Sequence, residues 1–96
     1  MRIIAKWFLM EMAQRHADSV TAVERWHAVA RKAEWHNLVE VRDIFPAADL
    51  VGDQTVFNIA GNRYRLIVHI RYDTGIIYIK QLLTHAEYDK GDWKND

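Results

Sequence analysis

The feature that most constrains the fold is a stretch of period-two patterning that fills the second half of the chain. Apolar and polar side chains alternate through residues 55–60, 63–72 and 76–84, as is typical of strands with one buried face. Two short turn sequences, Gly61-Asn62 and Asp73-Thr74-Gly75, separate these runs. Connections of this length join antiparallel neighbours, so the pattern predicts a three-stranded antiparallel meander.

The first half of the chain has helical patterning instead. Residues 3–4 predict a short strand, and the nearly all-round apolar residues 5–16 predict a largely buried helix. A second helix is predicted from a capping box at Thr21-Ala-Val-Glu24 to about Trp35. A short helical turn and a loop over residues 47–53 are expected before the meander.

These elements predict an α+β fold in one domain spanning residues 1–96, with the N-terminal strand and two helices packed on the meander. A second capping box, Thr84-His-Ala-Glu87, and a stop signal at Gly91 predict a short C-terminal helix. We expect three tryptophans in the core: Trp7, Trp26 and Trp35.

Composition limits the classes of function. The net charge is zero and half of the residues are apolar, which does not suit a disordered chain or a uniformly basic nucleic-acid binder. The absence of cysteine excludes disulfides and thiolate chemistry, and is compatible with a cytoplasmic location. Because Lys6 and Glu11 interrupt the apolar N-terminal stretch, we expect no signal peptide and no membrane association. The histidine spacing suggests no metal site, and we expect no cofactor.

Positive charge concentrates on the meander, where four cations between residues 56 and 83 stand against Asp73 alone. Alternation points one set of side chains toward the helices: Phe57, Ile59, Tyr64, Leu66, Val68, Ile70, Tyr72, Ile77, Ile79 and Leu83. It points a second set toward an open face: Asn58, Arg63, Arg65, His69, Arg71, Tyr78, Lys80 and Thr84. Such a face can bind RNA, because guanidiniums pair with phosphates and rings stack on unpaired bases. A solvated polar face, or a surface for an acidic partner, stays open as an alternative.

Metal-free RNA cleavage requires cations around the phosphate, a base for the 2′-hydroxyl and an acid for the leaving 5′-oxygen. Arg65 is the first candidate for the cationic role, followed by Arg63 and Arg71, and Lys80 is the next candidate for phosphate contact.

Candidates for proton transfer are His69 and His85, because an unperturbed imidazole titrates near a pH of about 6.5. Tyr88 lies three residues after His85 on the predicted C-terminal helix, and is a candidate to stack on a base or donate a proton. Which of these groups is base or acid stays open.

Several segments also resemble a known family: VFNIAGNRYRL at residues 56–66, YIK at 78–80, LTHAEYD at 83–89, and Trp93-Lys94. They are similar to the HigB-type toxins of bacterial toxin–antitoxin pairs, part of the RelE-like superfamily of mRNA-cleaving toxins. The resemblance implies a RelE-like fold and a metal-independent endoribonuclease that cuts mRNA on the ribosome. It also implies a helix-turn-helix antitoxin as partner, and catalytic groups on or just after the last strand, where His85 and Tyr88 lie. A non-catalytic RNA- or protein-binding module on the same sheet is the alternative.

Overall fold

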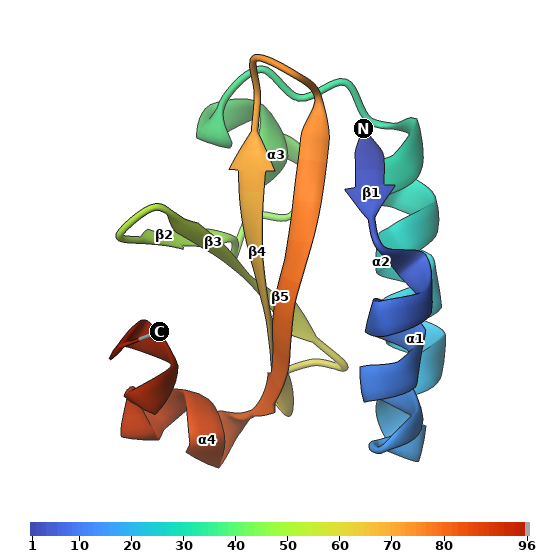
Figure 1. Ribbon diagram of the computed structural model, residues 1–96, viewed down its shortest axis with the longest axis vertical. Coiled ribbons are helices and arrows are strands. Elements are labelled where there is room, and N and C mark those ends of the chain that lie inside the picture. Colours follow the sequence, from blue (N-terminus) through green and yellow to red (C-terminus); the bar gives the residue numbers. More distant parts are fainter. Residues whose placement is uncertain (96) are drawn as a thin grey trace.

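One five-stranded sheet, in the order β1-β5-β4-β3-β2, organises the computed structural model, which describes residues 1–95 (Figure 1). The strands are β1 (Arg2–Ile4), β2 (Asp49–Val51), β3 (Gln54–Ile59), β4 (Tyr64–Arg71) and β5 (Ile76–Thr84). Antiparallel pairing of β3 with β4 and of β4 with β5 confirms the meander. β1 lies parallel to β5, and β2 pairs antiparallel with β3. The prediction of a loop over residues 47–53 is therefore wrong in its middle, where a three-residue strand forms.

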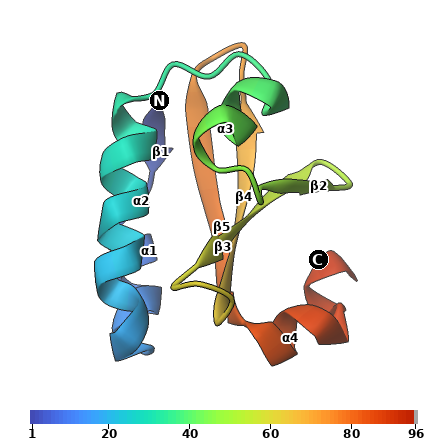
Figure 2. The ribbon, with the colours of Figure 1, turned by 180° about the vertical axis from the view of Figure 1, so that it is seen from behind.

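The helices lie on both sides of this sheet. They are α1 (Lys6–Gln14), α2 (Val20–Lys32), α3 (Leu38–Ile44) and α4 (His85–Lys90), with short 3-10 helices η1 (Ala17–Ser19) and η2 (Asp92–Asn95). Figures 1 and 2 show α1 and α2 side by side along one side of the sheet, and α4 with the C-terminal segment on the other side. The predicted α+β class, with helices packed on a meander and a short C-terminal helix, is confirmed.

The start of α2 differs from the prediction. The helix begins one residue before Thr21, so Thr21 lies inside it and the capping box predicted there is wrong. The Ser19 hydroxyl donates to the His16 carbonyl oxygen (2.7 Å), which ties η1 to the end of α1. The helix ends at Lys32 rather than near Trp35, because the next residue has an extended backbone.

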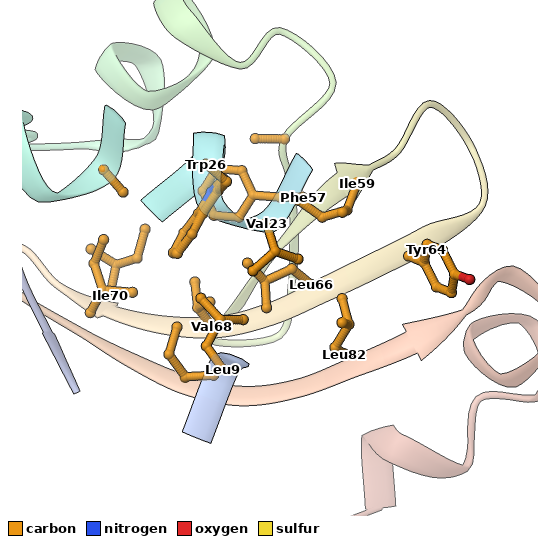
Figure 3. Packing of buried hydrophobic residues seen from close by; sticks show 14 of the residues in the cluster. Leu9, Val23, Trp26, Phe57, Ile59, Tyr64, Leu66, Val68, Ile70 and Leu82 are labelled. Carbon is orange, nitrogen blue, oxygen red and sulfur yellow. The ribbon is translucent and has the colours of Figure 1, made fainter. Parts of the chain in front are cut away.

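The main core lies between the sheet and α1, α2 and α3, and Figure 3 shows Phe57 beside Trp26 within it. The Phe57 ring centroid lies 5.2 Å from that of Phe45, 5.3 Å from that of Trp26 and 6.4 Å from that of Trp35. These aromatic contacts join β3 to α2, to the residue that directly follows α3, and to the segment between the two helices. The predicted burial of Trp26 and Trp35 is confirmed.

Trp7 does not lie in the core. Its side chain is 70% exposed, because α1 directs only Leu9 and Ala13 fully inward. Both the core position predicted for Trp7 and the prediction of a largely buried first helix are therefore wrong. Within residues 1–95, every helix is too short or too polar to cross a membrane.

A β-bulge in β5 changes which side chains share a face. Val68 pairs with Ile79 and the preceding residue, Ile67, pairs with Gln81, so the ladder skips Lys80. A bulge places one extra residue in a strand and breaks its alternation. The side chains of β5 after Lys80 therefore lie on the opposite faces from those that regular alternation predicts.

Two predicted placements fail for this reason. Leu82 is buried in the main core, and Thr84 pairs with Tyr64, which belongs to the same core. Leu83 lies on the other face. The prediction of Leu83 as a core residue and of Thr84 on the open face is wrong, since nothing in the local pattern marks the extra residue.

Candidate nucleic-acid interface

The sheet face away from α1 and α2 carries a second, smaller apolar cluster. Val56, Ile67 and Trp93 are buried there, and Leu83 and Tyr88 pack against them. The Trp93 ring stacks on that of Tyr88 with centroids 5.2 Å apart, and its Nε1 donates to the Tyr88 carbonyl oxygen (3.1 Å). The prediction of a fully open face is therefore wrong at one end of the sheet, because α4 and η2 fold back over that end.

The capping box at the start of α4 fixes this C-terminal segment. The Glu87 backbone N–H donates to Thr84 Oγ1 (3.1 Å), and the Thr84 N–H donates to Glu87 Oε1 (2.9 Å). The Thr84 N–H lowers the pKa of the Glu87 carboxyl, so this side chain is committed to the cap as an anion. Gly91, with φ of 77°, ends the helix. The predicted cap and stop are confirmed.

Arg65 is the only arginine among residues 1–95 that is buried, with 8% of its surface exposed. Its Nη1 donates to the carbonyl oxygens of Asn62 (3.2 Å) and Tyr64 (3.1 Å), and its Nη2 donates to Asn62 Oδ1 (2.7 Å). The guanidinium carbon lies 5.6 Å from the centroid of the Tyr88 ring. In the described part of the chain these partners are all neutral, so the buried charge has no carboxylate beside it. Buried charges are normally paired, and an unpaired one attracts an anion.

The other two arginines of the meander are paired with carboxylates. Arg63 precedes β4, and its Nη1 lies 2.9 Å from Oδ2 of Asp18. Asp18 also accepts a hydrogen bond from the Tyr64 hydroxyl, and together Tyr64 and Arg63 lower the pKa of the Asp18 carboxyl. The placement of Arg63 on the open face is wrong, because this ion pair turns it toward η1. Arg71 does lie at the end of β4, but its Nη2 is 2.8 Å from Oδ2 of Asp73.

Lys80, Tyr78 and His69 form a second group near the middle of the same face. Lys80 Nζ lies 6.0 Å from the Tyr78 ring centroid, and the His69 ring stacks on Tyr78 at 6.3 Å. Lys80 is exposed and forms no ion pair within residues 1–95. His69 Nδ1 lies 3.0 Å from the Asp53 carbonyl oxygen. Because a carbonyl only accepts, we infer that Nδ1 carries the hydrogen and that a neutral His69 ring keeps its lone pair on Nε2.

Asn58 and His85 are the other predicted site residues at this end of the sheet. His85 begins α4, and its Nδ1 lies 3.6 Å from Oδ2 of Asp89, an ion pair when the imidazole is protonated. Tyr88, on the same helix, turns instead toward the sheet and Trp93. Asn58 is exposed on β3 directly opposite Arg65.

Six of the nine predicted site residues form two groups along one face. The Arg65 group consists of Arg65 and Tyr88, with His85 at the start of α4. The Lys80 group consists of Lys80, Tyr78 and His69. Arg65 and His69 are four residues apart on one strand, a separation of roughly 13 Å at the strand rise. One phosphate cannot contact both Arg65 and His69, so a ligand that reached both residues would have to be extended. Within residues 1–95, no three histidine, aspartate or glutamate side chains gather as a metal site would require.

Several residues of this face were missed by the sequence reasoning. Trp93 borders three hollows, and each is lined by one lysine: Lys80, Lys90 or Lys94. Gln54 lines two of these hollows, and its Oε1 is buried without a hydrogen-bond partner in the described part of the chain. Asn62 holds Arg65 from the β3–β4 turn. Trp93, an apolar residue within a polar C-terminal segment, was the one sign in the sequence that this segment packs on the sheet. The roles of Gln54 and Asn62 depend on tertiary contacts.

The chain matches a known protein family over most of its length. Residues 19–91 match the HigB toxin family, described as the RelE-like toxic component of a toxin–antitoxin system. The chain belongs to the HigB toxin family. The matched region extends from η1 to the end of α4, and includes both the Arg65 group and the Lys80 group. The predicted resemblance is confirmed, and an antitoxin is the partner that membership of such a system implies.

Individual HigB proteins align along nearly the whole chain. The mRNA interferase HigB of Escherichia coli O6:H1 (strain CFT073) is 28% identical over 93 residues, which cover 94% of this chain and 90% of that protein. The mRNA interferase toxin HigB of Escherichia coli K12 is 24% identical over 92 residues, covering 93% and 88%. The mRNA interferase HigB of Shigella flexneri is also 24% identical over 92 residues.

Proposed function

We propose that this chain is the toxin of a toxin–antitoxin pair and acts as an endoribonuclease that cleaves mRNA. The observation that carries the proposal is the buried guanidinium of Arg65, which has only neutral partners in the described chain. A phosphodiester would supply the missing negative charge, and a positive charge at low dielectric stabilises the extra charge of a pentavalent phosphate. The aligned HigB proteins, which are named mRNA interferases, support the same activity.

The Arg65 group and the Lys80 group contact different parts of an extended RNA strand. Arg65 contacts the phosphate at the cleaved bond, and Tyr88, whose ring covers the guanidinium, lies next to the reacting atoms. His85, exposed at the start of α4, exchanges a proton with the substrate. Lys80 binds a neighbouring phosphate, while Tyr78 and His69 offer a ring pair on which a base can stack.

The proposal also covers where the toxin acts, whether it needs a metal ion, and which partner inhibits it. The toxin cuts mRNA on the ribosome, in the cytoplasm, and needs no metal ion because side-chain cations stabilise the transition state. A helix-turn-helix antitoxin neutralises it. Cleavage of ribosome-bound mRNA whose rate does not change when Mg²⁺ is replaced by polyamines and exchange-inert cobalt hexammine, which hold ribosomes together without binding substrate oxygens directly, would support metal independence.

Mapping of mRNA 5′ ends after induction of the toxin tests the function. We expect growth arrest together with new 5′ ends inside coding regions. Arg65→Ala should abolish both effects, whereas Arg25→Ala, an exposed arginine on α2 away from this face, should leave both unchanged.

Two results would overturn parts of the proposal. Growth arrest by the wild type without new 5′ ends would instead support a non-catalytic RNA- or protein-binding module. New 5′ ends of undiminished abundance with a folded Arg65→Ala variant would show that the site is elsewhere.

A further inference from the structure

Asn62 binds the Arg65 guanidinium through two different oxygens. Its backbone carbonyl accepts from Nη1 (3.2 Å) and its side-chain Oδ1 accepts from Nη2 (2.7 Å). One residue therefore spans the end of the guanidinium that carries both Nη atoms. The Tyr64 carbonyl accepts a further bond from Nη1 (3.1 Å), and the guanidinium carbon lies over the Tyr88 ring, 5.6 Å from its centroid.

These bonds leave donors on one edge of the guanidinium without a partner within residues 1–95. An arginine has five N–H donors, two on each Nη and one on Nε. Two of the three bonds come from Nη1 and one from Nη2, and residues 1–95 supply no acceptor to Nε. The remaining donors are Nε–H and the second Nη2–H, which point the same way along the side edge. That pair of parallel donors matches two oxygens of a phosphate.

The turn between β3 and β4 is built to bring Asn62 to this position. Ala60 and Gly61 both adopt positive φ (54° and 67°), which reverses the chain directly before Asn62. The His85 backbone N–H donates to the Arg63 carbonyl oxygen (2.9 Å), so the far side of the turn is fixed to the start of α4. The turn, Arg65 and α4 therefore form one connected unit.

We infer that Asn62 is a positioning residue, which holds Arg65 with its side edge toward the phosphate that is cleaved. This inference rests on the proposed function. It extends the site to a residue whose own side chain touches no substrate: Asn62 acts only through Arg65.

A double-mutant cycle on mRNA cleavage tests the assignment, with purified full-length toxin and ribosome-bound mRNA as substrate. Asn62→Ala keeps the backbone carbonyl bond and removes the side-chain carboxamide, whose Oδ1 accepts from Nη2. We expect its kcat to fall about tenfold to hundredfold, as when a catalytic group is misplaced by about 1 Å, with KM nearly unchanged. The double variant Asn62→Ala/Arg65→Ala should cleave no more slowly than Arg65→Ala alone, because the Asn62 side chain has no effect without its partner.

Thr74→Ala, an exposed position in the β4–β5 turn, is the matched control and should keep the wild-type kcat. Thermal unfolding of each variant identifies a loss of activity that comes from unfolding. If Asn62→Ala folds and keeps the wild-type kcat while Arg65→Ala is slow, the positioning role is overturned and the proposed function stands. If the fall in kcat of the double variant equals the product of the two single falls, the positioning role is also overturned. If Arg65→Ala cleaves at the wild-type rate, the proposed site itself fails.

Discussion

Single residues on this face differ mainly in whether their charge is already paired. Arg63 and Arg71 hold carboxylates at 2.9 and 2.8 Å, so an incoming phosphate would have to compete with Asp18 or Asp73. Arg65 and Lys80 have no such partner within residues 1–95. Among the four cations of the meander, the electrostatic attraction for RNA therefore concentrates on these two side chains.

Lys80→Ala should weaken RNA binding and make it less sensitive to salt. A lysine that neutralises one phosphate of a single strand contributes about 0.7 to the slope of log K against log salt concentration. We expect the slope, measured with single-stranded RNA by fluorescence anisotropy, to fall by about that amount. Lys32→Ala, an exposed lysine at the end of α2, is the control and should leave the slope unchanged. A normal slope for Lys80→Ala would remove Lys80 from the interface.

At this scale the sequence predicts which residues share a face better than it predicts their environment. Strand alternation correctly places Arg65, His69 and Lys80 on one side of the sheet. It does not predict that Arg65 is buried, because the ring that covers it comes from α4, more than twenty residues later. Nor does it predict the Arg63–Asp18 pair, which joins residues 45 positions apart.

At the scale of elements, α4 shows why a cap motif needs its structural context. Thr84-Glu87 and Thr21-Glu24 have the same spacing, yet only the first forms a capping box. The strand β5 ends at Thr84 and leaves its backbone extended, which is the conformation that an N-cap requires. Thr21 is preceded by η1, which runs directly into α2, so no cap position arises there.

Thr84→Ala should therefore destabilise the protein, and Thr21→Ala should not. Loss of an N-cap threonine costs about 1 kcal/mol. Thr21 is exposed inside a helix, where alanine has the higher helix propensity, so its replacement should be neutral or slightly stabilising. The free energies of unfolding from urea titrations check both. Equal effects of the two substitutions would contradict the assigned helix starts.

At the scale of the whole molecule, the two sides of the sheet have different composition and different tasks. The side facing α1, α2 and α3 is a continuous apolar core centred on Phe57. The other side combines a small cluster around Trp93 with the charged and aromatic groups of the interface. The α+β class and the meander could be predicted, because local periodicity determines them. The strand β2 and the bulge at Lys80 could not, because pairing with neighbouring strands creates them.

The stability of the whole molecule should decrease as the pH falls from 7 to 5. Burial, reinforced by Lys6 and Arg31, lowers the pKa of His27 below its ordinary value of 6.5, so the folded protein favours the neutral ring. A group with a depressed folded pKa stabilises the fold above its unfolded pKa, and this contribution is lost as the pH falls. Urea titrations should show the free energy of unfolding beginning to decrease near pH 6.5. In the His27→Gln variant this decrease should be smaller. Below about pH 4.5, protonation of Glu87 and Asp18, whose pKa values are also lowered, should decrease stability further.

The most direct measurement is the single-turnover rate of mRNA cleavage by Arg65→Ala, with and without guanidinium ion in the buffer. Loss of a charge that stabilises the transition state should slow cleavage by about 10²–10³-fold. Millimolar guanidinium, too dilute to unfold the protein, should bind in the vacated space and restore part of the rate. Arg65→Met, which keeps the packing of the side chain without its charge, should be equally slow and show no rescue. Cleavage at the wild-type rate by either folded variant would contradict the account.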